Sequence, residues 1–500
     1  MPPRLVIREV NLLAAVRQFA SGKTNASLDD IPDNELDRWA SLPLTHIWGM
    51  GAWRRSVASR AVALQHPDLL PEYARALPDW CEDDVVGSPY SVFAYEISRQ
   101  LGTKPAFARF RKRLADRGIG LLLDFVPNHL AVDHPWVLQR PDRFVMRTNV
   151  EDNITPPRGW FEVKTKQGIR WIAHGRDPYF PPWTDTAQLD YRRAETRKAM
   201  IQELLRITEL CDGVRCDMAM LVLNSIFRKT WWGGQEEPLE FWVQAIDAVR
   251  AVKPSFIFIA ETYWGTENRL VELGFDAVYD KDFLTRVVET KTNELRSTLS
   301  ERRMWGQRRI RFLENHDESR IASVLSPERL QLAITLLWLQ PGHILWHEGL
   351  ETGARIRLPV QLVRRPVEPV QPELVDFLHR GFEYLTGFPF ARAEAQMLPV
   401  HPPGLSGDSF EMLIPILWST GGRHLLWVGN LSDAVASARI PLHLSGMAGR
   451  NVVLRELRDG THYLRDGDEL LNIGLFVQLA PDGMHWFELS FQPKASESAK

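Results

Sequence analysis

Short apolar runs alternate with longer amphipathic stretches along roughly the first 385 residues of the chain. Eight of the runs have the length and aliphatic content of buried strands. The stretches between them, such as 105–118, 197–210 and 238–252, have apolar residues at helical spacing. Strands that alternate with helices predict right-handed βαβ units and a parallel sheet. The predicted strands are residues 5–10, 45–50, 120–126, 212–217, 256–261, 275–280, 309–314 and 343–348.

The number of predicted strands favours a closed barrel over an open sheet. Eight strand–helix units over this length fit an α/β fold of the (β/α)8 TIM-barrel type. In the sequence, no glycine-rich dinucleotide fingerprint follows any of the runs, which argues against an open doubly wound sheet. In a barrel, the residues at the carboxyl ends of the strands surround the active-site mouth.

The pattern also predicts how the chain divides. The barrel is expected to comprise residues 1–129 and 193–387, interrupted after the third strand by a proline-rich and aromatic-rich insertion. This insertion, residues 130–192, should overhang the barrel mouth. From 388 to 493, short apolar runs separated by turns predict a C-terminal antiparallel β-sandwich, followed by a polar tail at 494–500.

Composition narrows the class of protein. The chain is 44% hydrophobic and 25% charged, as in ordinary globular proteins, and its formal net charge is −3. It therefore has no basic surplus for a phosphate backbone, and no nucleic-acid partner is expected. Apolar runs are too short to span a bilayer, so no membrane partner is expected. Three cysteines and an N-terminus without a signal-peptide pattern favour a cytoplasmic location.

Four acidic residues lie at or just beyond the ends of predicted strands: Asp124, Asp217, Glu261 and Asp317. In a barrel they would converge on one cavity, although they are far apart in the sequence. Carboxylates gathered in a cleft repel, so one stays ionised while another keeps its proton. Cleavage of a glycosidic bond requires one ionised and one protonated carboxyl group, because one group attacks the sugar carbon while another protonates the leaving oxygen.

Neighbouring residues suggest a role for each carboxylate. Arg215 lies two residues before Asp217, on the same side of the strand, and should keep that carboxylate ionised as a nucleophile. Glu261 has no cation adjacent in sequence, so burial should raise its pKa and suit it to proton donation. Asp317, beside His316, could hold sugar hydroxyls. A single aspartate at a strand end is, however, more often a helix cap or a loop ion pair.

Four short motifs resemble the ordered signature regions of the α-amylase family of glycoside hydrolases. They are "DFVPNH" at 124–129, "GVRCD" at 213–217, "AE" at 260–261 and "NHD" at 315–317. The resemblance extends over the predicted barrel and the trailing β-domain. It implies a retaining enzyme that acts on α-glucosidic bonds, as a hydrolase or a transglycosylase, through a covalent glycosyl-enzyme.

The resemblance also implies roles for individual residues. Asp217 would be the nucleophile, Glu261 the general acid/base, and Asp317 the group that grips the sugar 2- and 3-hydroxyls. The remaining residues expected to bind substrate or support the site are Arg215, His129, His316, Asp124, Tyr90 and Trp264. Tyr90 comes from a looser match at 87–103, and Trp264 is one of several loop tryptophans whose flat faces suit sugar rings.

One departure from the family pattern bears on the substrate. Many starch-degrading members carry Lys-His three and four residues after the nucleophile, where this chain has Met220 and Leu221. Either the barrel rim packs apolar side chains there, or the acceptor side lacks those polar groups. Together with the insertion tryptophans, this favours an α-linked sugar substrate of short length, or a transfer reaction. The tryptophans are Trp136, Trp160, Trp171 and Trp183.

No cofactor is expected to be required. The resemblance raises calcium at Asn128, but a hard cation needs six or more oxygen ligands, and no complete set is evident. Asn128 is therefore interpreted as a hydrogen-bonding residue, and no His/Cys cluster in the sequence suggests zinc. The acidic residues that the insertion offers are Asp133, Asp152, Asp177 and Asp185.

Two other classes of function remain as alternatives. A non-catalytic carbohydrate-binding protein on the same fold would be favoured by loss of a catalytic carboxylate, but all three are present. A barrel enzyme acting on a phosphorylated small molecule should have a glycine-rich phosphate loop after the late strands, which the sequence lacks.

Overall fold

The fold was analysed in a computed structural model that describes most of the chain. The described residues are 4–20, 22–23, 25–147, 159–165, 168–231, 239–300, 307–404 and 409–494. Most of the predicted polar tail, 495–500, lies outside them.

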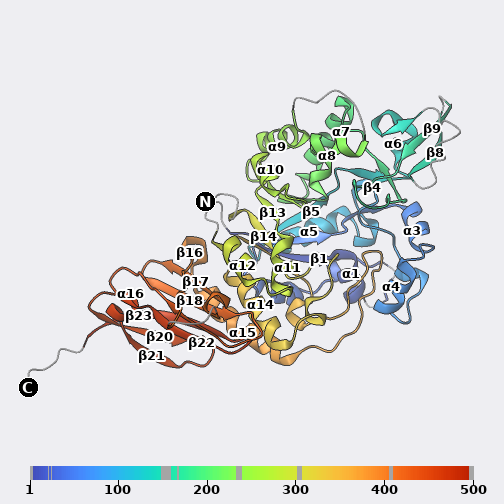
Figure 1. Ribbon diagram of the computed structural model, residues 1–500. Coiled ribbons are helices and arrows are strands. Elements are labelled where there is room, and N and C mark those ends of the chain that lie inside the picture. Colours follow the sequence, from blue (N-terminus) through green and yellow to red (C-terminus); the bar gives the residue numbers. More distant parts are fainter. Residues whose placement is uncertain are drawn as a thin grey trace, which may run out of the picture.

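Eight parallel strands close into a barrel, as the sequence predicts (Figure 1). The ring closes where β1 pairs with both β2 and β15, with Ile7 opposite His46 on one side and Leu345 on the other. The barrel strands are buried along nearly their whole length. This explains why their sequences are continuous apolar runs and do not alternate between apolar and polar residues. The barrel strands are β1 (Val6–Asn11), β2 (His46–Met50), β5 (Gly120–Phe125), β11 (Gly213–Cys216), β12 (Ile257–Ala260), β13 (Ala277–Tyr279), β14 (Arg309–Arg311) and β15 (His343–His347).

Helices follow the strands around the barrel. Several begin with side-chain caps: Thr103 accepts a hydrogen bond from Ala106 N and Ser326 accepts one from Arg329 N, each with a proline in the first turn. The helices are α1 (Leu12–Ala20), α2 (Asp33–Ala40), α5 (Lys104–Ala115), α7 (Ala194–Ile207), α8 (Asn224–Trp231), α9 (Phe241–Val252), α10 (Glu267–Glu272), α11 (Lys281–Val288), α12 (Thr292–Leu299), α14 (Pro327–Leu339) and α15 (Pro372–Gly387).

Two excursions leave the barrel. The predicted one lies between β5 and α7 and forms two small antiparallel sheets with a short helix. A second, which the sequence analysis did not predict, lies between β2 and α5 and packs against residues 354–363 after β15. Their elements are β6 (His129–Ala131), α6 (Pro135–Gln139), β7 (Met146–Arg147), β8 (Trp160–Thr165), β9 (Gly168–Ala173) and β10 (Thr186–Gln188) in the first, and β3 (Trp53–Arg55), α3 (Val57–Ala63), α4 (Leu69–Ala76) and β4 (Val92–Ile97) in the second.

The C-terminal region is an antiparallel β-domain of two sheets around its own apolar core, as predicted. The larger sheet has the strand order β16-β17-β18-β23-β20-β21, and β19 pairs with β22. The elements are β16 (Glu394–Met397), β17 (Leu413–Thr420), β18 (Arg423–Asn430), β19 (Ala436–Ile440), β20 (Arg450–Glu456), β21 (His462–Asp466), α16 (Gly467–Asn472), β22 (Leu475–Leu479) and β23 (Met484–Pro493).

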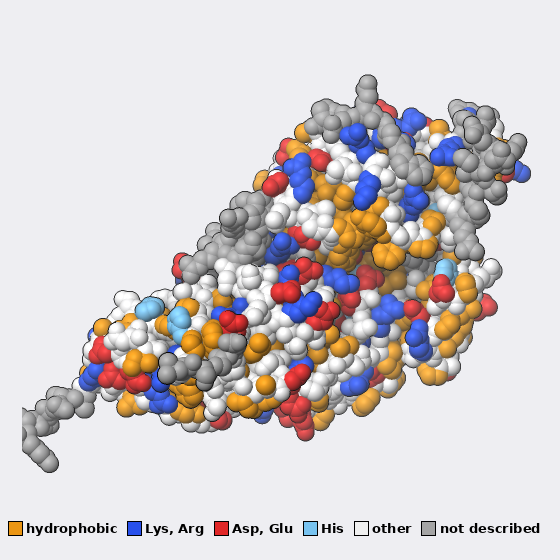
Figure 2. All heavy atoms as spheres, viewed as in Figure 1, with side chains coloured by type: hydrophobic (Ala, Val, Ile, Leu, Met, Phe, Trp, Pro, Cys, Tyr) orange, Lys and Arg blue, Asp and Glu red, His pale blue; other side chains and the backbone are white. Residues whose placement is uncertain are grey.

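This domain is fixed to the barrel by a shared apolar layer. One face of the large sheet carries Trp418, Trp427 and Trp486, which belong to the same core cluster as residues of α14 and α15. Helix α14 is therefore buried on nearly all sides and is apolar around its circumference. Figure 2 shows acidic and basic side chains intermixed over the visible surface. Among the described residues, no helix combines the length and apolar character needed to cross a bilayer.

Candidate active site

The four carboxylates lie at the carboxyl ends of barrel strands. Asp124 is the next-to-last residue of β5, Asp217 and Glu261 directly follow β11 and β12, and Asp317 lies in the loop after β14. Asp124, Asp217 and Glu261 are buried, whereas the side chain of Asp317 is 50% exposed. The predicted acidic residues thus gather at one end of the barrel.

The Arg215 guanidinium connects three of them. Its Nη1 donates to Asp217 Oδ1 at 2.7 Å and lies 3.7 Å from Asp124 Oδ1, while Nη2 lies 2.8 Å from Glu261 Oε2. No cation adjoins Glu261 in sequence, but Arg215 lies beside it in space. Strands β11 and β12 are parallel neighbours, so the long Arg215 side chain reaches across to a carboxylate distant in sequence. Arg215 donates to Asp217 through Nη1 and not in a bidentate manner, because its second terminal nitrogen faces Glu261.

Glu261 is held by two further groups. The Met218 backbone N–H donates to Oε2 at 2.7 Å, and the Tyr263 hydroxyl donates to Oε1 at 3.0 Å. Met218 has a left-handed backbone with φ 41°, uncommon for a residue with a side chain. Burial raises the pKa of Glu261 to about 7, against the opposing charge of Arg215. At neutral pH this carboxyl group therefore holds a proton for a substantial part of the time.

Asp217 lies in a different environment from Glu261. Burial raises its pKa above the usual value, and the charge and hydrogen bond of Arg215 oppose that rise. The Arg215 contact to Asp217 is a well-aligned hydrogen bond, whereas Nη2, which faces Glu261, has no aligned partner among the described residues. Because an aligned charged donor favours the ionised form, Arg215 favours a negative charge on Asp217.

Asp317 and His316 form a second charged unit at the mouth. His316 Nε2 lies 3.0 Å from Asp317 Oδ2 and 2.8 Å from the Tyr90 hydroxyl. Half of the Asp317 side chain is exposed, so its partial burial opposes ionisation only in part; the charge of His316 outweighs this and lowers the pKa of Asp317 to about 2. Tyr90 also stacks on the His316 ring and lies under the Arg215 guanidinium, with its ring centroid 5.2 Å from Cζ. The structure therefore places the predicted Tyr90, His316 and Asp317 together.

Asp124 lies beneath the other carboxylates. Trp48 Nε1 donates to its Oδ1 at 3.1 Å, and the Gly51 N–H donates to its Oδ2 at 3.3 Å. Burial raises its pKa to about 7, although Arg215 opposes this. Its contacts are those of a supporting residue.

The two remaining predicted residues are His129 and Trp264. His129 is buried in β6, where Asn128 Nδ2 lies 3.3 Å from its Nδ1 and Trp183 lies against the ring at 5.2 Å. Trp264 is 40% exposed and packs edge-on against Tyr179 of the insertion, with ring centroids 4.8 Å apart. Trp264 thus offers an aromatic surface close in sequence to Glu261.

The residues around Asn128 do not fit a calcium site. The Asn128 amide is paired with Gln188, which donates to Asn128 Oδ1 at 3.0 Å and accepts from its Nδ2 at 3.2 Å. Asp177 caps the following turn, and Asp185 accepts from Ser59. Asp152 lies outside the described residues. Across the described ranges, no group of three or more His, Cys, Asp or Glu side chains could hold a metal ion.

Two further features shape the cavity. Met220 and Leu221 are fully buried in the turn after β11, which fits the interpretation of apolar packing. Beyond Asp317, Arg357 forms an ion pair of 2.6 Å with Glu72 of α4, and its charge contributes to lowering the Asp317 pKa. This pair joins the unpredicted excursion to the loop after β15 on that side of the mouth.

Sequence reasoning missed four residues of this site: Glu9, Met218, Tyr263 and Tyr279. Glu9 Oε1 lies 2.5 Å from His316 Nδ1, and the Tyr279 hydroxyl lies 3.4 Å from Arg215 Nε. Arg8 and Glu9 interrupt the apolar run of β1, a signal that the sequence did contain. For the other three, the functional atom is a backbone N–H or a hydroxyl near a strand end, which no local pattern distinguishes from packing.

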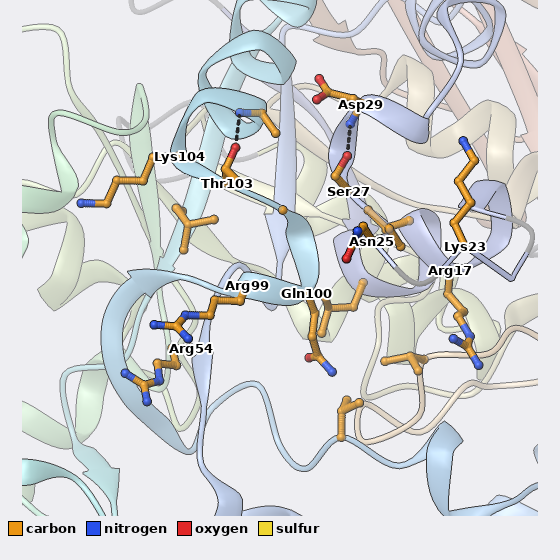
Figure 3. Close-up of a pocket in the computed structure, with 18 of the residues that line it drawn as sticks. Arg17, Lys23, Asn25, Ser27, Asp29, Arg54, Arg99, Gln100, Thr103 and Lys104 are labelled. Carbon is orange, nitrogen blue, oxygen red and sulfur yellow. Dashed lines mark hydrogen bonds between the residues drawn. The ribbon is translucent and has the colours of Figure 1, made fainter.

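A wide groove lies elsewhere on the protein. It has a volume of about 980 Å³ and is formed by α1, β4, the start of α5 and their connecting loops (Figure 3). Arg17, Arg54, Arg99 and Lys104 border it, together with exposed Glu96. None of the four carboxylates lines this groove, so it is distinct from the candidate active site.

Comparison with known proteins gives the family of this chain. Residues 90–357, more than half of the chain, match the family described as alpha amylase, catalytic domain. The chain belongs to the α-amylase family. The matched segment contains every barrel strand from β5 to β15 and the four carboxylates.

Individual relatives are distant. The alpha-amylase MalA of Haloarcula japonica is 26% identical over 270 residues, which are 53% of this chain and 36% of MalA. The 1,4-alpha-glucan branching enzyme GlgB of Nocardia farcinica is 29% identical over 246 residues, 45% of this chain and 29% of GlgB. The chain thus matches only about a third of each relative. The noncanonic maltogenic alpha-amylase AmyB of Thermotoga neapolitana has the same fold, with a TM-score of 0.67 at 22% identity, covering 98% of this chain and 99% of AmyB.

Proposed function

We propose that the protein is a retaining glycoside hydrolase or transglycosylase that acts on α-glucosidic bonds of short sugars. The observation that carries the proposal is the single guanidinium of Arg215 in contact with both Asp217 and Glu261. Such a bridge requires a close pair of carboxylates, and retaining enzymes have their two groups about 5–5.5 Å apart.

The two carboxylates would act in sequence. Ionised Asp217 attacks the anomeric carbon while protonated Glu261 gives its proton to the leaving oxygen. The covalent glycosyl-enzyme that results is opened by water or by a sugar hydroxyl, whose proton returns to Glu261. Asp317 and His316 would contact the ring hydroxyls, and the negative charge of Asp317 favours the positive charge that develops at the ring.

Two features support a short substrate. Met220 and Leu221 provide no polar group to the acceptor side, since both are buried. On the side of Asp317, the Arg357–Glu72 ion pair joins the loop after β15 to α4 and would limit how far a sugar chain extends. One relative, from Burkholderia pseudomallei, is named an alpha-1,4-glucan:maltose-1-phosphate maltosyltransferase, so transfer to a sugar acceptor belongs to the proposal alongside hydrolysis.

A substrate panel tests this proposal. Maltose, maltooligosaccharides, trehalose, sucrose and isomaltose are incubated with the protein, and products are separated by chromatography, with and without glucose or glycerol as acceptor. We expect α-configured products from at least one sugar, observed by proton NMR before mutarotation. β-Configured products would exclude the retaining mechanism, and no product from any of these sugars would exclude the substrate class.

The nucleophile assignment has a matched control. Asp217→Asn should abolish turnover and leave the circular dichroism spectrum unchanged, because the amide keeps the shape and loses the charge. Asp212→Asn is the control: Asp212 directly precedes the same strand at its other end, where it pairs with Arg111 at 2.7 Å. Equal activity in the two variants would remove Asp217 from this role.

We also propose that catalysis requires no metal. Because Gln188 occupies the Asn128 amide, incubation with EDTA should leave both the activity and the unfolding temperature unchanged. A loss of activity that added calcium restores would contradict this.

A further inference from the structure

Three charged groups form a row across the barrel mouth. Glu9, in the middle of β1, contacts His316 Nδ1 through Oε1 at 2.5 Å, and His316 Nε2 contacts Asp317 Oδ2 at 3.0 Å. Glu9 is 0% exposed and His316 is 3% exposed. A carboxylate placed in the interior of a barrel strand needs a compensating partner, and the imidazole ring of His316 is that partner.

The geometry favours a proton on each ring nitrogen. A carboxylate oxygen can only accept, so the contact at Nδ1 with Glu9 places a proton on that nitrogen, and the carboxylate of Asp317, 3.0 Å from Nε2, favours a second one there. A neutral imidazole has one N–H and would leave a lone pair facing a carboxylate. The Tyr90 hydroxyl at Nε2 can accept as well as donate, so it is compatible with the doubly protonated ring.

We infer that Glu9 is a positioning residue that holds His316 as an imidazolium, whose Nε2 side forms an ion pair with Asp317. Asp317 is then kept ionised and oriented at the place where the proposed function puts the sugar hydroxyls. Glu9 does not touch the substrate itself, and its effect passes through the His316 ring.

The other charged and titratable groups nearby are consistent with this role. Arg215 of β11 and His347 of β15 also face Glu9, and both favour its ionised form. Glu9 Oε2 has no hydrogen-bond partner among the described residues, so His316 is the only donor to this carboxylate there. Burial disfavours a charged ring, yet Asp317 and Glu9 together raise the pKa of His316 well above its usual value.

The protonation state can be measured without any substrate. The protein is labelled with ¹⁵N-histidine, long-range ¹H–¹⁵N correlation spectra are recorded, and the His316 signal is assigned by its loss in His316→Asn. We expect an imidazolium in the wild type at about pH 8, where an unperturbed histidine is neutral. In Glu9→Gln we expect a neutral ring at the same pH. A neutral His316 in the wild type, or an unchanged titration in Glu9→Gln, would overturn the inference.

Glu351→Gln is the matched control. Glu351 is a well-buried carboxylate that pairs at 2.6 Å with Arg8, the residue beside Glu9 whose side chain points to the other face of β1. This variant should leave the His316 signal unchanged. A similar shift in both variants would show a general loss of structure rather than a role for Glu9.

The kinetic consequence rests on the proposed function. On the best sugar of the panel, Glu9→Gln should lower kcat/KM by roughly 10- to 100-fold, the range expected for loss of one charged hydrogen bond. If the wild type acts on none of the sugars, the proposed function fails, and the NMR measurement still decides the role of Glu9. Wild-type kcat/KM in Glu9→Gln would contradict the catalytic part of the inference.

Discussion

In the proposed mechanism, Glu261 controls how the activity depends on pH. That mechanism needs its proton on the leaving oxygen, and burial raises its pKa to about 7. The protonated form is abundant below that value and disappears as the pH rises through it, so kcat/KM should decline above about pH 7. The check is a pH profile with a natural sugar and with α-glucosyl fluoride, whose leaving group needs no proton. The decline should be absent with the fluoride, and its persistence would assign it to another group.

At the residue scale, the sequence predicted which carboxylates lie at the carboxyl ends of the barrel strands, but not the contacts among them. Asp217, Glu261 and Asp317 were found because carboxylates are rare at the ends of buried apolar runs. The contact between Arg215 and Glu261 could not be predicted, because it depends on the adjacency of β11 and β12 and on the reach of a long side chain. The left-handed Met218, whose N–H holds Glu261, also follows from the tertiary structure and not from its residue type.

Among the elements, the spacing of β11 and β12 determines whether Asp217 and Glu261 can share one guanidinium. Gly213 opens β11, and a Cβ atom there would lie 2.5 Å from Ile257 O of β12. Gly213→Ala should therefore displace one strand against the other and lower kcat/KM at least about tenfold, since small misplacements of catalytic groups are costly.

Gly387→Ala is the control for that substitution. Gly387 ends α15, and a Cβ atom there meets nothing within 4 Å. The activity of this variant should match the wild type. If Gly213→Ala were equally active, the strand spacing would not be limiting.

The barrel strands were predictable as elements because they are buried on both faces and separated by amphipathic helices. The excursion between β2 and α5 could not be predicted in this way. Its α3 and α4 bury small faces, with few apolar residues each, against the loop after β15 rather than against the barrel. The local pattern of apolar residues does not indicate that this segment packs beside the barrel mouth. The segment nevertheless brings Tyr90 and Glu72 to the site.

For the whole molecule, the apolar layer between barrel and β-domain should contribute a large part of the stability. Trp427 is 0% exposed in this layer. Trp427→Ala should lower the free energy of unfolding by about 3–5 kcal/mol, measured by urea unfolding followed by circular dichroism. Leu464→Ala, at a residue that is 57% exposed in β21, should change it by less than about 0.5 kcal/mol. Equal effects would mean that the layer contributes little.

The most direct test of the proposed mechanism is to trap its covalent intermediate. In Glu261→Gln the group that activates the second acceptor is absent, so α-glucosyl fluoride should react once and the product should remain on the protein. Intact-mass spectrometry should show the addition of one hexosyl unit, and peptide mapping should place it on Asp217. Two results would contradict the account. One is no added mass in a folded variant when the wild type turns over the fluoride, and the other is a hexosyl unit on a residue other than Asp217.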